Sequence, residues 1–188
     1  GCFKKGLMLD EKSAVINFDI GNIMYLKGNI AEAIKYYNKA DECGTLTADM
    51  FDVIAGLFIE TQEYTQGLRF LNRAIELDPL NGKYYLEKVN IFIEQEKVEE
   101  ALETLSELNK LLPDAYEAYD IMSEIYTLKR EYDKAMAVID KGIDRFPKDE
   151  NLAYLRFRVF CKFEKDEEAI KYLDELKPYL KKEIKSDK

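Results

Sequence analysis

Histidine and tryptophan are absent from this 188-residue sequence. The absence of histidine excludes Ser-His-Asp and Cys-His catalysis, zinc sites of the H-E-x-x-H type and a histidine general base. The glycine-rich sequences that hold nucleotide phosphates, G-x-G-x-x-G and G-x-x-x-x-G-K-[ST], are missing as well. We therefore expect a protein that is not an enzyme and that has no catalytic residues, no metal and no cofactor.

Cysteines and long apolar runs are also scarce. Cys2, Cys43 and Cys161 lie far apart and form no C-x-x-C pair, which argues against a disulfide framework and favours a reducing compartment. Cys161 has no base near it in the sequence, so an inert thiol is favoured over a nucleophile. No apolar run approaches the roughly 18 residues that span a membrane. We expect a cytoplasmic protein, while the start at Gly1 leaves a removed signal peptide, or a lipid-modified Cys2, as alternatives.

Positive charge is in the minority, because 28 Lys and Arg face 37 Asp and Glu for a net charge of −9. Phosphate binding draws on clustered cations, so no nucleic-acid partner is expected. The one basic stretch, KPYLKKEIKSDK at the C-terminus, is interpreted as a solvated helix end. Acids in KVEEA, EYDKA and KDEEA are interpreted as first-turn helix residues that favour the helix dipole, rather than as acid–base catalysts.

Four prolines and nine glycines favour long helices over many short strands. The small residues recur at a fixed interval. In frames of 34 residues counted from Ala14, position 20 is always Ala or Gly: Ala33, Gly67, Ala101, Ala135 and Ala169. Position 11 is always large and apolar: Met24, Phe58, Phe92, Tyr126 and Phe160. The interval predicts an internal repeat.

Each frame carries the pattern of two amphipathic helices. In the second frame the first apolar stripe consists of Phe51, Ile54, Ala55 and Phe58. A second stripe runs from Tyr64 to Ile75, and Pro79 then ends the frame because proline lacks the N–H that a continued helix needs. The small residue at position 20 allows two antiparallel helices to approach closely. A helix pair cannot bury its apolar stripe alone, so we expect the pairs to stack.

This layout resembles the tetratricopeptide repeat family, whose unit is a 34-residue helix–turn–helix. The segment IGNIMYLKGNIAEAIKYYNKA, residues 20–40, is the best match, with Gly21, Gly28, Ala33, Tyr37 and Ala40 at positions where the family prefers small, small, small, aromatic and small residues. The resemblance covers residues 14 to about 176. It implies an all-α fold, a right-handed α-solenoid of stacked antiparallel helix–turn–helix repeats.

The register predicts the boundaries of the repeats. Residues 1–13 are expected to be the end of a preceding truncated repeat, since FKKGLMLDE stays in phase with later second helices. The five repeats are expected at 14–47, 48–81, 82–115, 116–149 and 150–177, and a basic cap or tail at 178–188. Pro178 is expected to end the last helix near Leu176. It would also suit the first helical position of a short polar cap. The fifth repeat departs from the pattern at Phe157 and Asp166, as terminal repeats do.

The resemblance also implies where a partner would bind. In this family the first helices line a concave face that contacts extended or helical peptides, through positions 2, 5, 9, 12 and 13. The residues expected to form the partner groove are Phe18, Asn22, Tyr25, Asp49, Asp52, Lys83, Leu86, Asn90, Ile93, Glu117, Asp120, Glu124, Tyr154 and Arg158. The same positions also hold Val15, Leu26, Gly56, Ile59, Glu60, Glu94, Thr127, Leu128, Asn151, Cys161 and Lys162.

The expected groove combines apolar anchors with an acidic centre. Phe18, Tyr25, Leu86, Ile93 and Tyr154 are expected to present exposed apolar area, which often marks an interaction site. Lys83 is the one basic residue among the acids expected in the middle of the groove. These acids would therefore favour a partner segment with Lys or Arg beside apolar side chains. The alternative is that the acids serve solubility alone.

Some members of the family bind chaperone C-terminal tails through a carboxylate clamp. The matching positions here are Phe18, Asn22, Val53, Lys83 and Glu87. Only Asn22 and Lys83 fit, and Glu87 would repel a carboxylate, so such tails are disfavoured unless upstream repeats supply the clamp. We expect a protein–protein interaction scaffold or adaptor. The alternatives are a regulatory or substrate-recruiting module of a larger multidomain protein or enzyme, and a structural repeat protein that self-associates end to end.

Overall fold

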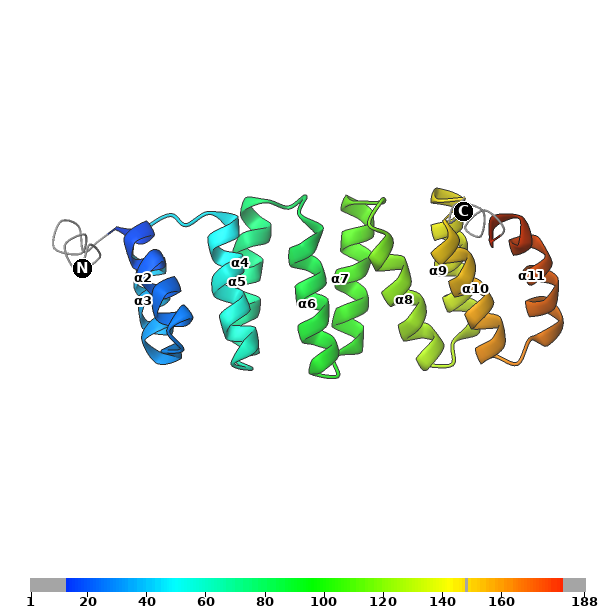
Figure 1. Cartoon of the computed structure of the whole chain (residues 1–188), viewed down its shortest axis with the longest axis horizontal. Helices are drawn as coiled ribbons and strands as arrows, with labels where there is room; N and C mark the ends of the chain where they lie inside the picture. The colour runs from blue at the N-terminus through cyan, green and yellow to red at the C-terminus, as the bar shows by residue number, and fades with distance from the viewer. Residues whose placement is uncertain (1–12, 148, 181–188) are drawn as a thin grey trace, which may run out of the picture. The chain divides into compact units, whose positions relative to one another are not determined.

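The computed structural model describes residues 13–147 and 149–180, and all of the regular secondary structure in these ranges is α-helical. These ranges contain ten consecutive helices (Figure 1). They are α2 (Ala14–Leu26), α3 (Ile30–Cys43), α4 (Ala48–Glu60), α5 (Tyr64–Leu77), α6 (Gly82–Glu94), α7 (Val98–Leu111), α8 (Tyr116–Leu128), α9 (Tyr132–Arg145), α10 (Glu150–Lys162) and α11 (Asp166–Leu180). The predicted all-α class with paired helices is confirmed.

The helices begin at intervals of 34 residues. α2, α4, α6, α8 and α10 each start at the first position of a frame, and the second helix of each pair starts at position 17. Side-chain oxygens of Ser13, Thr47, Asn81 and Asp149 accept hydrogen bonds from backbone N–H groups in the first turn. Such caps satisfy donors that have no partner inside a helix, and they fix where four of the first helices begin.

The turn inside each helix pair has a left-handed residue that the periodicity did not predict. Gly28, Gln62, Glu96, Arg130 and Glu164 lie 34 residues apart, and their φ angles are 73°, 60°, 60°, 60° and 56°. Only the first of these is glycine, the residue that adopts positive φ without steric cost. The other four turns therefore hold L side chains in a conformation that costs roughly 1–2 kcal/mol each.

The chain forms two compact units, and the boundary between them falls between Glu96 and Lys97. In unit 1, α2 packs on α3, α4 packs on α5, and α5 packs on α6 (Figure 1). In unit 2, α7 packs on α8, α8 on α9, α9 on α10, and α10 on α11. The boundary thus separates the two helices of the expected repeat 82–115.

Aromatic rings fill the core of unit 1, where small residues admit them. Phe18 lies 5.7 Å from Tyr37 between ring centroids, and Phe58 lies 5.5 Å from Phe70. A Cβ atom added to Gly21 would lie 2.5 Å from the Tyr37 ring, which is far inside van der Waals contact. Ala33 at position 20 is fully buried. The small side chains therefore mark close approaches between the two helices of a pair.

Unit 2 has a separate core built around Tyr119, Ile139, Leu152 and Val159. The Tyr119 hydroxyl donates to the carbonyl oxygen of Pro113 at 3.2 Å. The same contact occurs in unit 1, where the Tyr85 hydroxyl donates to the carbonyl of Pro79 at 3.3 Å. The periodic prolines thus end one repeat and also anchor the first helix of the next, a role that the sequence pattern did not indicate.

One expected helix boundary is wrong. Pro178 was expected to end the last helix near Leu176, whereas α11 continues through Pro178 to Leu180. A proline removes only its own N–H from the helix ladder, so a helix can continue through it at a cost of about 3 kcal/mol. Apart from Ser13, the predicted end of a preceding repeat lies outside the described residues, as do Cys2 and residues 181–188 of the predicted tail.

Candidate partner-binding surface

Seven of the expected groove residues of unit 1 lie on α2, α4 and α6, and we call this set the unit 1 surface. It consists of Tyr25, Asp49, Asp52, Lys83, Leu86, Asn90 and Ile93. Tyr25 is 38% exposed and Ile93 is 42% exposed, and Leu86 is half-buried. These three side chains supply the apolar part of the surface.

Two expected members of the groove are used by the core instead. Phe18 is only 7% exposed and packs against the ring of Tyr37, so the prediction that it is an exposed apolar anchor is wrong. Because Gly21 has no side chain, the Tyr37 ring fits closely against α2. Phe18 packs on that ring instead of facing solvent. The Tyr37 hydroxyl donates to Oδ1 of the half-buried Asn22 at 2.6 Å, so this acceptor is already occupied.

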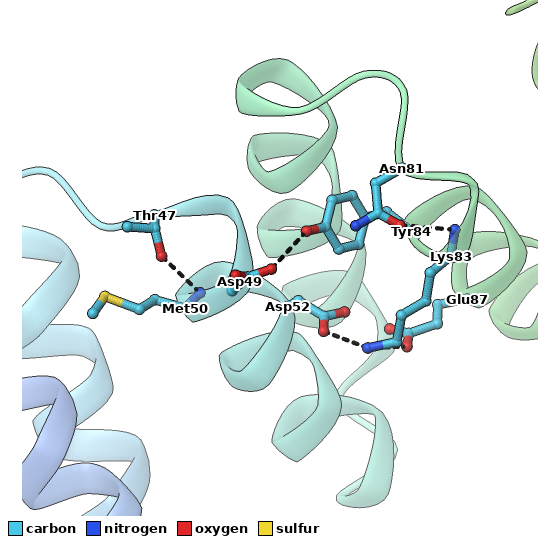
Figure 2. Close-up of polar contacts among 8 residues, drawn as sticks. All are labelled: Thr47, Asp49, Met50, Asp52, Asn81, Lys83, Tyr84 and Glu87. Carbon is cyan, nitrogen blue, oxygen red and sulfur yellow. Dashed lines mark hydrogen bonds and ion pairs between the residues drawn. The ribbon is translucent and has the colours of Figure 1, made fainter.

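A lysine lies between two carboxylates where α4 faces α6. The Lys83 ammonium lies 2.5 Å from Oδ2 of Asp52 and 3.3 Å from Oε1 of Glu87 (Figure 2). The hydrogen bond to Asp52 raises the pKa of Lys83. Burial, and then the charge of Asp52, raise the pKa of Glu87 above its ordinary value. The Asp52 side chain is only 12% exposed, so most of this carboxylate lies beneath the surface.

Tyrosine hydroxyls take up other carboxylates of unit 1. Tyr84 on α6 donates to Oδ1 of Asp49 on α4 at 3.2 Å (Figure 2). Tyr25 donates to Glu60 at 2.7 Å, across from α2 to α4. Tyr64 at the start of α5 donates to Glu94 at the end of α6, also at 2.7 Å. The hydrogen bonds to these carboxylates raise the pKa of Tyr25 and of Tyr64.

Part of the hydrogen-bonding capacity of the unit 1 carboxylates therefore serves the fold. Each of these contacts joins neighbouring repeats, because its partners lie 30 to 35 residues apart. Sequence reasoning placed the carboxylates on the groove but did not predict the hydroxyl groups that bind them. Tyr25, Tyr64 and Tyr84 stand at positions 12, 17 and 3 of their frames, so no repeated position indicated them.

In unit 2 the expected positions lie on α8 and α10. Tyr154 is 61% exposed, as expected for an apolar anchor, and Glu117 and Glu124 are exposed. A nitrogen of the Arg158 guanidinium lies 4.0 Å from Oδ1 of Asp120. Burial raises the pKa of Asp120, and the charge of Arg158 opposes that rise.

A pocket of about 300 Å³ lies beside these residues, and we call it the basic pocket. It is lined by Glu124, Thr127, Leu128, Arg130, Arg158 and Lys162. Five of the six were placed at groove positions by register. Arg130 was missed because it lies in the turn after α8, outside the first-helix positions.

The described residues contain neither a metal site nor a membrane-spanning helix. Among residues 13–147 and 149–180, no group of three or more cysteine or carboxylate side chains could hold a metal ion. Within the same ranges no helix is long and apolar enough to cross a bilayer. Cys161 is exposed and free.

The sequence is similar to known repeat proteins. A sequence model described as "Tetratricopeptide repeat" matches residues 14–42 and 116–149. Sperm-associated antigen 1 of Mus musculus is 30% identical over 122 residues, which cover 64% of this chain and 13% of that protein. The chain spans less than a fifth of the length of the curated relatives that it matches.

Solved structures share the fold. YrrB, described as a TPR protein with an unusual peptide-binding site, aligns with a TM-score of 0.60 and 25% identity over 80% of this chain and 77% of its own. The MamA protein aligns with a TM-score of 0.70 over 93% of this chain and 96% of its own. At 19% identity, the similarity to MamA concerns the fold alone.

Proposed function

Because the chain is a tetratricopeptide repeat protein, we propose that it is a protein–protein interaction module that holds a peptide segment of a partner against its first helices. The observation that carries the proposal is the exposure of Tyr25 and Ile93 on helices that also carry acids. Exposed apolar side chains at several matching positions favour binding over solvation, because an acidic surface that served solubility alone would not need them. The similarity to YrrB, which has a peptide-binding site, supports the same class of function.

The chemistry of the unit 1 surface favours a segment with a basic side chain next to an apolar one. Asp52 and Glu87 share the single ammonium of Lys83, so the three groups together remain negative when both carboxylates are ionised. A lysine or arginine of the partner would be attracted by this negative charge, while its apolar neighbour would contact Leu86 and Ile93.

A chaperone C-terminal tail fits this surface less well. Its terminal carboxylate would need free cations and amides, whereas Lys83 is engaged by Asp52 and Glu87. Asn22, the other matching residue of a carboxylate clamp, accepts the hydrogen bond of Tyr37. The partner proposed here is accordingly a protein segment of basic and apolar character.

Selection from a library of random peptides displayed on phage tests the proposal. We expect the purified chain to enrich peptides in which Lys or Arg adjoins Leu, Ile or an aromatic residue. Leu86→Ala combined with Ile93→Ala should weaken binding of the enriched peptides about tenfold or more, since both apolar contacts are lost. Leu77→Ala combined with Leu80→Ala is the matched control, because these leucines are exposed in unit 1 but lie outside the first helices.

Equal binding by the two double variants would contradict the proposal, provided that both unfold in urea at the midpoint of the original chain. Enrichment of peptides without basic residues would overturn the proposed role of Asp52 while leaving the apolar contacts in place.

A further inference from the structure

The arginines of this acidic chain are paired with carboxylates except at the basic pocket of unit 2. Arg69, Arg73, Arg145 and Arg156 each have a carboxylate oxygen within 3.2 Å. At the pocket, Arg158 has its nearest carboxylate at 4.0 Å, and Arg130 has none among the described residues. The ammonium of Lys162 likewise has no ion-pair partner in the described part of the chain. The two arginines with the weakest carboxylate pairing thus lie, together with Lys162, around one pocket.

Arg130 is held in place by its surroundings. Its backbone is in the left-handed region, with φ at 60°. Its Nη1 donates to the carbonyl oxygen of Lys162 at 2.8 Å, and its guanidinium carbon lies 5.9 Å from the centroid of the Phe163 ring. One bond to a carbonyl leaves most of the five N–H donors of a guanidinium available. The donors are therefore positioned before any ligand arrives, which lowers the entropic cost of binding.

The pocket combines this positive charge with a small volume and an apolar wall. About 300 Å³ is at the lower limit for small-molecule sites and suits a single side chain. Leu128 is 77% exposed at its edge and can contact methylene groups. Glu124 also lines the pocket, and its carboxylate offsets part of the positive charge of the three cations. Asp120, 4.0 Å from the Arg158 guanidinium, offsets a second positive charge, so these groups together keep a net charge of +1, which matches a group with one negative charge.

We propose that the basic pocket binds the carboxylate side chain of an acidic residue of a peptide. The N–H groups of Arg130 and Arg158 donate to the carboxylate oxygens, the Lys162 ammonium lies alongside, and Leu128 contacts the methylene stem. Hydrogen bonds between guanidinium and carboxylate are charge-assisted and directional. The proposal adds an acid-binding point in unit 2 to the proposed peptide-binding function. It does not depend on the unit 1 surface.

The smallest probe of this site is a single blocked amino acid. We would titrate the full ¹⁵N-labelled chain with N-acetyl-glutamate N-methylamide at 0.15 M salt and follow the ¹H–¹⁵N spectrum. We expect saturable shifts of the Thr127, Arg130 and Lys162 amides and of the Arg158 Nε–H, with a dissociation constant on the order of millimolar. The glutamine analogue, which has the same shape without the charge, should produce none of these shifts.

Variants separate the site from general charge effects. Arg158→Gln combined with Lys162→Gln should abolish the shifts, whereas Lys141→Gln, which removes an exposed charge elsewhere in unit 2, should leave them unchanged. Glu124→Gln should tighten binding by roughly threefold, because it removes the opposing carboxylate. A gain in affinity cannot arise from misfolding, so this variant keeps the test decisive if the double variant is unstable.

Three outcomes would overturn the proposal. The first is that the glutamine analogue produces the same shifts as the glutamate analogue. The second is that the glutamate analogue shifts only residues outside the pocket. A third is that N-acetyl-phosphoserine N-methylamide shifts the pocket resonances while the glutamate probe does not, which would assign the site to phosphate instead. Failure of the phage selection at the unit 1 surface would leave the result of this titration intact, so the two proposals fail separately.

Discussion

The first helices of the two units have the same backbone positions but different side-chain chemistry. In unit 1, Tyr25 at position 12 of one repeat donates to Glu60 at position 13 of the next. In unit 2, the same two positions hold Thr127 and Lys162, and the basic pocket lies there instead of a hydrogen-bonded pair. At these two positions, the residue across the neighbouring repeat decides whether a hydrogen bond closes the surface or a pocket is left open.

A second pair of positions shows the same contrast. Asp52 at position 5 of α4 is bound by Lys83 at position 2 of α6. In unit 2 the corresponding residues are Asp120 and the shorter Asn151, and Asp120 instead has Arg158 at 4.0 Å. Unit 1 thus uses acids of its first helices to join repeats, and the equivalent acid of unit 2 is paired more loosely.

The largest expected effect tests what the two units share, a tyrosine whose pKa is raised by burial. Burial raises the pKa of Tyr37 in unit 1 and of Tyr116 in unit 2 to about 12. An unfolded tyrosine loses its proton near pH 10. Between pH 10 and 12 the folded chain therefore binds more protons than the unfolded chain, and the free energy of unfolding should fall as pH rises.

Urea unfolding at pH 9, 10 and 11 measures this slope, to which each tyrosine adds at most about 1.4 kcal/mol per pH unit. Tyr37→Phe and Tyr116→Phe should each make the decline shallower. Tyr36→Phe is the control, because Tyr36 adjoins Tyr37 but is only half-buried. A slope that neither core variant changes would contradict the burial effect.

The next effect compares position 8 in the two units. Gly21→Ala should lower the free energy of unfolding by about 1–3 kcal/mol, because the added methyl group would overlap the Tyr37 ring. Ser123→Ala at the equivalent position of unit 2 adds no bulk and loses the bond from Ser123 Oγ to the carbonyl oxygen of Asp120, at a cost of about 1 kcal/mol. Chemical denaturation compares the two, and an equal cost would show that the helix pairs are not packed more tightly at Gly21.

The turns provide a smaller effect. Gly28 has φ of 73° in open space, and its counterpart in unit 2 is Arg130. Gly28→Ala should cost about 1 kcal/mol through backbone strain alone. Gly56→Ala, also in open space but inside α4, should instead stabilise by roughly 0.5–1 kcal/mol. Thermal unfolding measures the stability of both variants. If both are stabilised or both are destabilised, the conformational explanation is contradicted.

The smallest effect concerns one of the contacts between repeats that distinguish unit 1. Tyr84→Phe removes the hydrogen bond to Asp49 and should lower the free energy of unfolding by about 0.5–1.5 kcal/mol. Tyr36→Phe again provides the baseline. If Tyr84→Phe is neutral, the tyrosine–carboxylate contacts do not stabilise the stacking of repeats in unit 1.

The helix pairs could be predicted from sequence because their causes are local. Ala33 and its equivalents recur every 34 residues, and the helices begin where that interval places them. Phe18 was misplaced because the inward or outward direction of its position depends on space left by Gly21 and on the Tyr37 ring. The bond between Tyr25 and Glu60 is not periodic, so no repeat pattern could reveal it. The left-handed turn at Arg130 carries no glycine signal.

We propose that the first helices of unit 1 attract a basic side chain, whereas those of unit 2 bind an acidic one. Two probes on one labelled sample test this difference most directly. We would titrate the ¹⁵N-labelled chain separately with N-acetyl-arginine N-methylamide and N-acetyl-glutamate N-methylamide. The account predicts that the arginine probe shifts amides around Asp52 and Asn90 in unit 1, and that the glutamate probe shifts those around Arg130 and Lys162 in unit 2. Shifts of the same residues by both probes, or the reverse assignment, would contradict it.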